Sequence, residues 1–214
     1  MSDELIGIIV IILACVLVGA VVYKLFKVIE GKKLGNFQKI ANQYSSLRLE
    51  KDKQGKYGAK RGPILLGILE EKEFVGYTYV TGAGKHSVHW TAFKLKHGLN
   101  LEGYELKLVN EHFLRKIGKR LGTVNEVELG VQEFDQRFLI QSNNLSTSRN
   151  LLNKQTRDKM LSIPKMYFGE IVITNTELSY KLPYQLVNDK IYTEFEKSLD
   201  IGLLLLRALK RIYD

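Results

Sequence analysis

The residue pattern best suited to phosphate chemistry is the glycine-rich stretch TGAGKHS at residues 81–87. A phosphate-binding loop of the GxxxxGK[ST] type cradles phosphates with backbone N–H groups and a lysine. Here Tyr79 stands where the first glycine is required, and His86 replaces the serine or threonine. The stretch also lies between two strand-like segments and does not precede a helix. It therefore predicts a glycine-rich hairpin turn.

Two histidines in the same region, His86 and His89, form an HxxH pattern. On a strand, side chains three positions apart point to opposite faces, so this pair does not converge on a metal ion. His89 is instead expected to share a face with Phe93, with Trp90 on the other. The only cysteine, Cys15, lies in an apolar run. No metal site, disulfide or cofactor is therefore expected.

Clustered carboxylates are a third pattern with chemical potential, at Glu70, Glu71 and Glu73 and at Glu126 and Glu128. General acid–base catalysis also needs a nucleophile or an orienting partner close by. The sequence supplies neither, and it lacks the GxSxG pattern of serine hydrolases. Solvated strand ends explain these residues better, and we do not expect an enzyme.

Aromatic and basic residues alternate in the middle of the chain, a pattern that can stack bases and neutralise phosphates of single-stranded nucleic acid. The RNP pattern of RNA-binding domains is absent. Aromatic residues on strands more often belong to a core, so nucleic acid is not the expected partner. The residues concerned are Tyr77, Tyr79, Lys85, Trp90, Phe93, Lys94 and Lys96.

Residues 5–23 are an uncharged, apolar stretch long enough to cross about 30 Å of hydrocarbon as a helix. A buried core helix would show a polar face, and a cleaved signal peptide would begin with Lys or Arg. The segment ILAC ending at Cys15 loosely resembles a bacterial lipobox, but the residues that follow stay apolar. The sequence therefore predicts one retained transmembrane helix.

Positive charge is concentrated directly after this helix. Residues 24–61 hold eleven Lys or Arg and three acids, whereas the whole chain has a net charge of +9. Lysines directly after a membrane-spanning helix favour the cytoplasmic side, and the short N-terminal side carries only the acids Asp3 and Glu4. The N-terminus is therefore predicted outside the cell membrane and the soluble domain in the cytoplasm. Juxtamembrane lysines also attract anionic lipid. The predicted lipid-contacting residues are Lys24, Lys27, Lys32, Lys33, Lys51, Lys53, Lys56, Lys60 and Arg61.

The soluble part is predicted to be an α+β domain with a mainly antiparallel sheet. Its content of 45% apolar and 26% charged residues is typical of a folded globular protein. The predicted organisation is a tail at 1–4, a transmembrane helix at 5–23, a basic juxtamembrane linker or helix extension at 24–36 and the domain at 37–214.

Hydrophobic periodicity predicts the elements of this domain. A short helix is expected from Phe37 to Tyr44, and a wide apolar stripe predicts a closing amphipathic helix around Phe195 and Leu206. A helix after Ser146 or Ser148 should end before Pro164. Strands are expected at 47–50, 64–69, 74–80, 87–95, 104–109, 126–129, 136–141, 167–174 and 177–182, and a further helix at 111–120.

Residues 134–140, FDQRFLI, resemble a Phe-Asp-x-x-Phe pattern in uncharacterised bacterial membrane-anchored proteins of a domain-of-unknown-function family. The resemblance extends over about residues 126–212 and implies a membrane-anchored α+β protein without assigning an active site. On a strand, Asp135 and Arg137 would share a face and could pair, while Phe134 and Phe138 would enter the core.

Together these patterns predict a single-pass, membrane-anchored binding or scaffold domain, with a protein partner or a second copy in a membrane complex. The polybasic segment would contact anionic lipid headgroups. The alternative is a membrane-tethered enzyme or nucleic-acid-binding protein whose site the sequence does not display.

Overall fold

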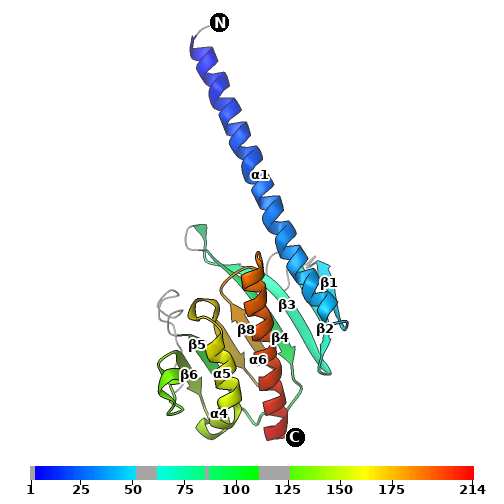
Figure 1. Cartoon of the computed structure of the whole chain (residues 1–214), viewed down its shortest axis with the longest axis vertical. Helices are drawn as coiled ribbons and strands as arrows, with labels where there is room; N and C mark the ends of the chain where they lie inside the picture. Colours follow the sequence, from blue (N-terminus) through cyan, green and yellow to red (C-terminus); the bar gives the residue numbers. More distant parts are fainter. Residues whose placement is uncertain (1–2, 52–61, 85–86, 111–125) are drawn as a thin grey trace.

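A computed structural model describes residues 3–51, 62–84, 87–110 and 126–214. These residues form one antiparallel sheet of eight strands packed against helices, which confirms the predicted α+β class (Figure 1). The sheet order is β1-β2-β3-β4-β8-β7-β5-β6. The strands are β1 (Leu47–Lys51), β2 (Pro63–Leu69), β3 (Lys72–Thr81), β4 (Val88–Lys96), β5 (Leu106–Asn110), β6 (Phe138–Ser142), β7 (Glu170–Ile173) and β8 (Glu177–Leu182).

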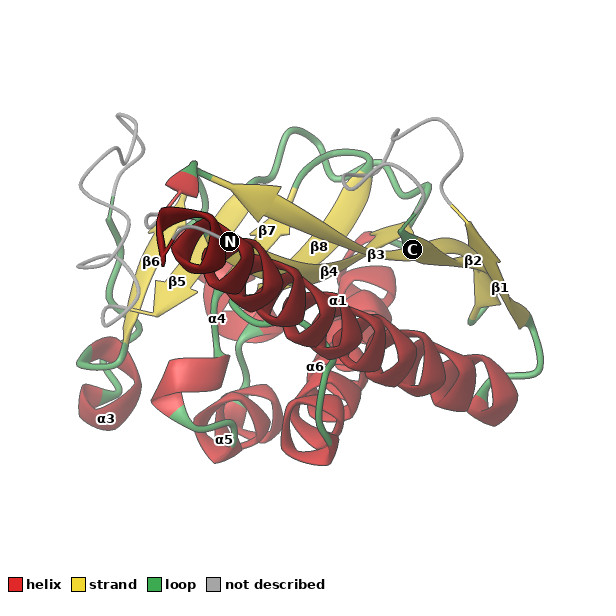
Figure 2. Cartoon of the chain, turned by 90° about the horizontal axis from the view of Figure 1, so that it is seen from above, coloured by secondary structure: helices red, strands yellow, loops and turns green. Residues whose placement is uncertain are grey.

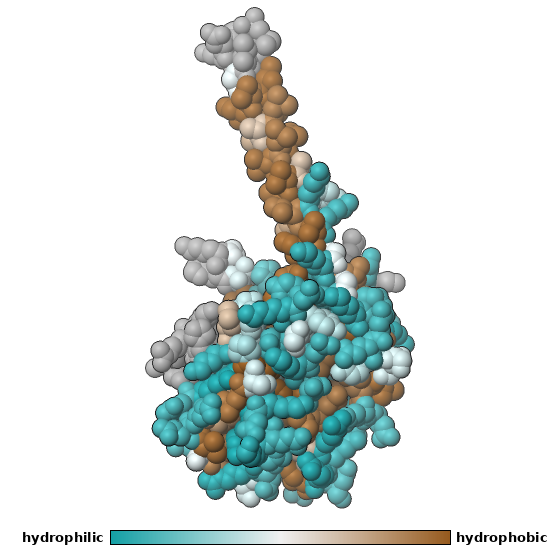
Figure 3. Space-filling view, viewed as in Figure 1, coloured by the Kyte–Doolittle hydropathy of each residue, from teal (hydrophilic) through white to brown (hydrophobic). Residues whose placement is uncertain are grey.

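Helix α1 (Asp3–Gln43) runs for 41 residues, about 60 Å, from the N-terminal end into the domain. Its first part projects away from the sheet and is apolar on its surface (Figure 3). Residues 24–36, the expected linker, are helical and continue α1 without a break. The predicted short helix at Phe37 is therefore the last part of α1, where Phe37, Ile40 and Ala41 are buried.

Helices α1, α4, α5 and α6 lie on the same side of the sheet (Figure 2). The closing helix α6 (Asp189–Tyr213) confirms its prediction, because its apolar stripe is buried against strands β4 and β8. Gly202 permits this close approach, since a Cβ atom there would lie 2.8 Å from the ring of Phe93. Phe93 in turn stacks on Tyr180 at 5.6 Å between ring centroids.

The β2-β3-β4 part of the sheet is a meander of hairpins. Strand β5 does not continue it, because the β7-β8 hairpin is inserted between β4 and β5. The strand predicted at 126–129 is reduced to a single bridge between Glu126 and Gln141, so that prediction is wrong. The helix predicted at 111–120 lies outside the described residues.

Two shorter helices, α4 (Leu145–Leu151) and α5 (Lys154–Ser162), replace the single predicted helix before Pro164. Their N-caps are Asn144 and Asn153, whose side-chain oxygens accept backbone N–H groups three residues on. The prediction that Ser146 or Ser148 caps the helix is therefore wrong. Asparagine fits because its carbonyl oxygen satisfies an N–H group that the helix itself leaves unpaired.

The Phe-Asp-x-x-Phe segment is a short helix, α3 (Gln132–Asp135), followed by β6, and not one strand. Its two phenylalanines are buried in the core, as predicted. The predicted pairing of Asp135 with Arg137 is wrong. Asp135 accepts the backbone N–H groups of Leu129 and Val131, and Arg137 donates to the carbonyl oxygens of Leu161, at 2.6 Å, and Ile163.

Candidate functional site

The sheet face turned away from the helices, called the outer face below, contains a hollow of about 480 Å³. Strand alternation places Phe93 and Tyr180 on the helix side and Lys94 and Ser179 on the outer face. The hollow is a consequence of side-chain size, because small Ser179 lies among much longer side chains. Its lining residues are Tyr77, Tyr79, Lys94, Val172, Glu177, Ser179 and Lys181.

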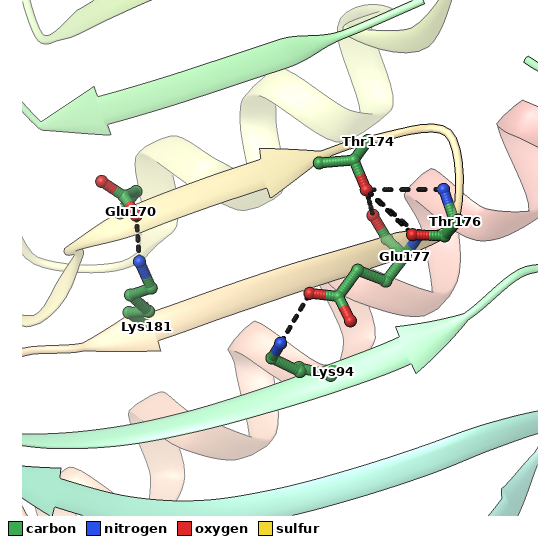
Figure 4. Close-up of polar contacts among 6 residues, drawn as sticks. All are labelled: Lys94, Glu170, Thr174, Thr176, Glu177 and Lys181. Carbon is green, nitrogen blue, oxygen red and sulfur yellow. Dashed lines mark hydrogen bonds and ion pairs between the residues drawn. The ribbon is translucent and has the colours of Figure 1, made fainter. Parts of the chain in front are cut away.

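Charged side chains on the outer face are joined in ion pairs across neighbouring strands (Figure 4). Lys94 Nζ lies 2.6 Å from Glu177 Oε1, and Lys181 pairs with Glu170. Glu170 also lies 3.3 Å from Lys107 Nζ on β5. The lysines and glutamates therefore form a row of hydrogen-bond donors and acceptors over strands β4, β8, β7 and β5.

Aromatic rings form the opposite wall of the hollow. Tyr77 and Tyr79 lie on β3 with their ring centroids 5.7 Å apart. Tyr79 stacks on Trp90 with centroids 5.9 Å apart and planes 7° from parallel, and Trp90 Nε1 donates to Thr81 Oγ1 at 2.8 Å. Burial raises the pKa of Tyr79 above its ordinary value, with a smaller contribution from Tyr77. The wall is therefore uncharged and aromatic at neutral pH.

The turn after β7 holds the acidic end of this site in position. Thr174 Oγ1 lies 3.3 Å from the backbone nitrogen of Glu177 and 3.4 Å from the hydroxyl of Thr176 (Figure 4). These contacts close the β7-β8 hairpin and set where Glu177 begins β8. The site is consequently built on strands and one tight turn, which hold ligand-facing groups more rigidly than long loops do.

Tyr77, Tyr79 and Lys94 belong to the aromatic and basic residues that alternate in the sequence, and the structure brings these three together at the hollow. That pattern does not include Glu177 or Lys181. A signal was present, because Glu177, Ser179 and Lys181 alternate with Leu178, Tyr180 and Leu182, the pattern of a strand with one polar face. Which strand lies beside β4 was not readable from that alternation.

The other chemical candidates have structural roles. His89 shares a face of β4 with Phe93, as predicted, and its Nδ1 is 2.7 Å from Gln185 Nε2. Glu70 pairs with Arg207 of α6, where that contact raises the pKa of the arginine. Glu73 Oε2 lies 2.5 Å from Lys96 Nζ. His86 lies outside the described residues.

The predicted lipid-contacting lysines are not equivalent. Lys24, Lys27 and Lys32 are exposed along α1, and Lys51 is exposed at the end of β1. Lys33 is only 4% exposed and its Nζ lies 2.6 Å from Glu30. The remaining predicted residues, Lys53, Lys56, Lys60 and Arg61, lie outside the described residues.

A second hollow, of about 310 Å³, lies where α1 meets the start of α6. Lys32 and Lys39 line it from α1, and Asn188 and Asp189 line it from α6. Lys39 Nζ lies 3.0 Å from Asp189 Oδ1, so part of the local charge is already neutralised. This junction packs α1 against the domain, and the ion pair leaves Lys39 less available to an anionic ligand.

No protein-family model matches the chain, and neither does any curated protein sequence. This agrees with the expected resemblance to an uncharacterised family. Among solved structures, the crystal structure of the mycobacterial trehalose monomycolate transport factor A, TtfA, has a similar fold, with a TM-score of 0.51. The likeness covers 87% of this chain and 96% of that one at 12% sequence identity. At that identity it is a likeness of fold.

Proposed function

We propose that this protein is a single-pass membrane anchor carrying a binding or scaffold domain that acts beside the membrane as part of a membrane complex. The observation that carries the proposal is the division of α1 into two unlike parts. Its N-terminal part is exposed and apolar, whereas its last turns are buried in the domain core. One unbroken helix therefore links the anchor to the sheet.

The apolar side chains of the first part of α1 are too exposed for a helix surrounded by water. The segment from Ile9 onward is apolar enough to cross a membrane, and its most apolar part is not buried against the described part of the domain. Val16, Leu17 and Val18 are each more than 60% exposed. A contiguous apolar surface of this kind needs lipid or another chain around it.

The structural neighbour supports a role in a membrane process. TtfA is named as a mycobacterial trehalose monomycolate transport factor. By analogy of fold, this chain would assist a membrane complex by binding and positioning, without catalysing a reaction itself. Its expected partners are anionic lipid headgroups and a membrane protein or a second copy of the chain.

The domain is proposed to face the cytoplasm, because Lys24, Lys27 and Lys32 directly follow the apolar stretch. This is testable with single cysteines in a Cys15→Ala background. Lys154→Cys, whose native side chain is 83% exposed, should react with a membrane-impermeant maleimide only after lysis, whereas Ser2→Cys should react in intact cells. The reverse result would place the domain outside.

The scaffold role needs its own test. The full chain, purified from membranes in a mild detergent, should retain a stoichiometric membrane protein or a second copy of itself. Chemical crosslinking in intact cells before extraction should give the same species. A strictly monomeric chain in both experiments would contradict the scaffold role while leaving the anchor intact.

A further inference from the structure

We propose that the outer-face hollow binds the uncharged sugar headgroup of a glycolipid, with the apolar part of the lipid lying along neighbouring strands β2 and β3. The sugar site rests on the residues of the hollow, whereas the choice of a lipid as the source of the sugar rests on the proposed membrane anchor.

Size and shape suit a small ligand. A volume of about 480 Å³ lies within the range of about 300 to 1,000 Å³ that is typical of small-molecule sites. Strand register explains the hollow, because Ala92 pairs with Lys181 and Ser179 pairs with Lys94. The small side chain of Ser179 therefore forms the floor of a depression bounded by charged and aromatic groups, and the short side chain of Ala92 on the same face lies buried beside it.

The existing ion pairs favour an uncharged, hydroxyl-rich ligand over an anion. Lys94 is bonded to Glu177 and Lys181 to Glu170, and Glu177 is 29% exposed at its side chain. An incoming anion would have to compete with a carboxylate for each ammonium group. A sugar hydroxyl donates to a carboxylate and accepts from an ammonium group at the same time, so it joins the row without breaking a pair.

The aromatic wall supports the same ligand class. Tyr77 and Tyr79 are flat, apolar surfaces with polar tips, and a sugar ring has an apolar C–H face and polar edges. The half-buried ring of Tyr79 is held by its stack on Trp90, so it is fixed before a ligand arrives. Few rotamers would then be lost on binding.

An apolar strip adjoins the polar hollow on the same face. Val75 is the register partner of Lys94, and Leu66 is the register partner of Val75. Leu66 and Val75 are half-buried, and Ile68 on the same strand as Leu66 is 54% exposed. A polar hollow continuous with exposed aliphatic side chains matches a ligand with a polar head and an apolar tail.

Trp90 makes the proposal directly measurable, because it is the only tryptophan in the chain. The full-length protein in an amine-oxide detergent, which contains no sugar, should show a saturable change in tryptophan emission when maltose is added. Inorganic phosphate should neither produce this change nor compete with it. Saturable binding of phosphate in preference to maltose, or no response to maltose, would overturn the sugar site.

Variants test whether the response comes from the hollow. Glu177→Gln removes an acceptor charge and should weaken maltose binding about fivefold or more. Ser179→Val fills the hollow without altering charge and should abolish the response. The matched control is Glu73→Gln, which breaks the Lys96 pair on the same face outside the hollow and should change affinity less than about twofold. Equal effects of Glu73→Gln and Glu177→Gln in folded proteins would refute the site.

The lipid source is tested by reconstitution in phosphatidylcholine vesicles with or without diglucosyl diacylglycerol. The glycolipid should change Trp90 emission and reduce the response to added maltose. Ile68→Ser, at an exposed position of the apolar strip, should weaken the glycolipid response and leave maltose binding unchanged. Maltose binding without any glycolipid response would overturn the glycolipid as ligand, and the topology experiment would still test the anchor independently.

Discussion

Asn36 donates a hydrogen bond from Nδ2 to the backbone carbonyl oxygen of Leu186, at 3.0 Å, across 150 positions of sequence. Asn36 lies on α1, and Leu186 precedes α6. Close by, Lys39 of α1 forms an ion pair with Asp189, the first residue of α6. These contacts attach α1 to the domain by a buried polar bond and an exposed ion pair.

Asn36→Ala should lower the free energy of unfolding by about 1 to 3 kcal/mol. Asn36 is only 5% exposed, so its loss leaves a buried carbonyl oxygen without its donor. The matched control is Gln38→Ala on the exposed side of α1, where a change within about 0.5 kcal/mol is expected. Urea unfolding of both variants, followed by circular dichroism, measures the difference. Equal losses in the two variants would mean that the hydrogen bond from Asn36 to Leu186 does not stabilise the fold.

Two glycine-to-alanine changes should alter the free energy of unfolding in opposite directions, although alanine is the better helix former by about 1 kcal/mol at both positions. At Gly35 nothing lies within 4 Å of the added Cβ atom, so Gly35→Ala should stabilise the protein. At Gly202 the Cβ atom would lie 2.8 Å from the ring of Phe93, and overpacking costs about 1 to 3 kcal/mol. Thermal unfolding should therefore rank Gly35→Ala above the parent and Gly202→Ala below it.

Much of the fold could be predicted because its signals are local. The apolar stripe of α6 and the alternation in β3, β4 and β8 specify an element and its buried face within a few residues. The sheet order could not be predicted, because the pairing of β4 with β8 depends on contacts more than 80 positions apart. The hollow depends on that pairing. Tyr77 and Tyr79 could be singled out from the sequence, whereas Glu177 reaches the hollow only because β8 lies beside β4.

The Phe-Asp-x-x-Phe segment illustrates a different cause of error. Its apolar spacing fits both a strand and a short turn of helix, and Phe134 and Phe138 are buried in either case. What decides is the side chain of Asp135, which accepts two backbone N–H groups of the preceding turn. Arg137 is then free to cap the carbonyl end of α5 instead of pairing with Asp135.

His97 should make the protein less stable as the pH falls. It is fully buried; its Nε2 lies 2.9 Å from the carbonyl oxygen of Thr174, and its Nδ1 accepts the N–H of Leu99 at 3.1 Å. The neutral ring satisfies both contacts, whereas protonation of Nδ1 would break one. Burial lowers the pKa of His97 below its ordinary value of 6.5, despite the opposing bond to Thr174.

Because the folded pKa is lowered, the unfolded chain binds more protons in the window below pH 6.5. The free energy of unfolding should therefore be unaffected by His97 above that pH and fall as the pH drops through the window toward the folded value. Urea titrations across this range should show the slope in the parent and in His89→Gln, whose site is exposed. His97→Gln should lack it, and a slope that survives this change would assign it to another group.

The structure narrows the set of lysines that can contact anionic lipid, because one of the four nearest the apolar stretch, Lys33, is buried. Lys33 is buried and paired with Glu30, whereas Lys24, Lys27 and Lys32 are exposed. Each basic residue near an anionic leaflet contributes about 1 kcal/mol, reduced by screening beyond about 8 Å. The three exposed lysines together should therefore contribute at most about 3 kcal/mol, and Lys33 should contribute almost nothing through lipid.

A fragment that begins at Lys24 should bind vesicles containing phosphatidylserine, release them as salt is raised, and ignore neutral vesicles. Changing Lys24, Lys27 and Lys32 together to glutamine should weaken this binding by up to about a hundredfold, the equivalent of about 3 kcal/mol. Lys32→Gln and Lys33→Gln are a matched pair, because each removes one positive charge from neighbouring positions of the same helix. Lys32→Gln should weaken vesicle binding, whereas Lys33→Gln should lower thermal stability and leave vesicle affinity unchanged. Equal loss of affinity in these two single variants would mean that total charge matters and that the burial of Lys33 does not. Tighter binding to single-stranded RNA than to vesicles at the same salt concentration would instead favour a nucleic-acid partner for this segment.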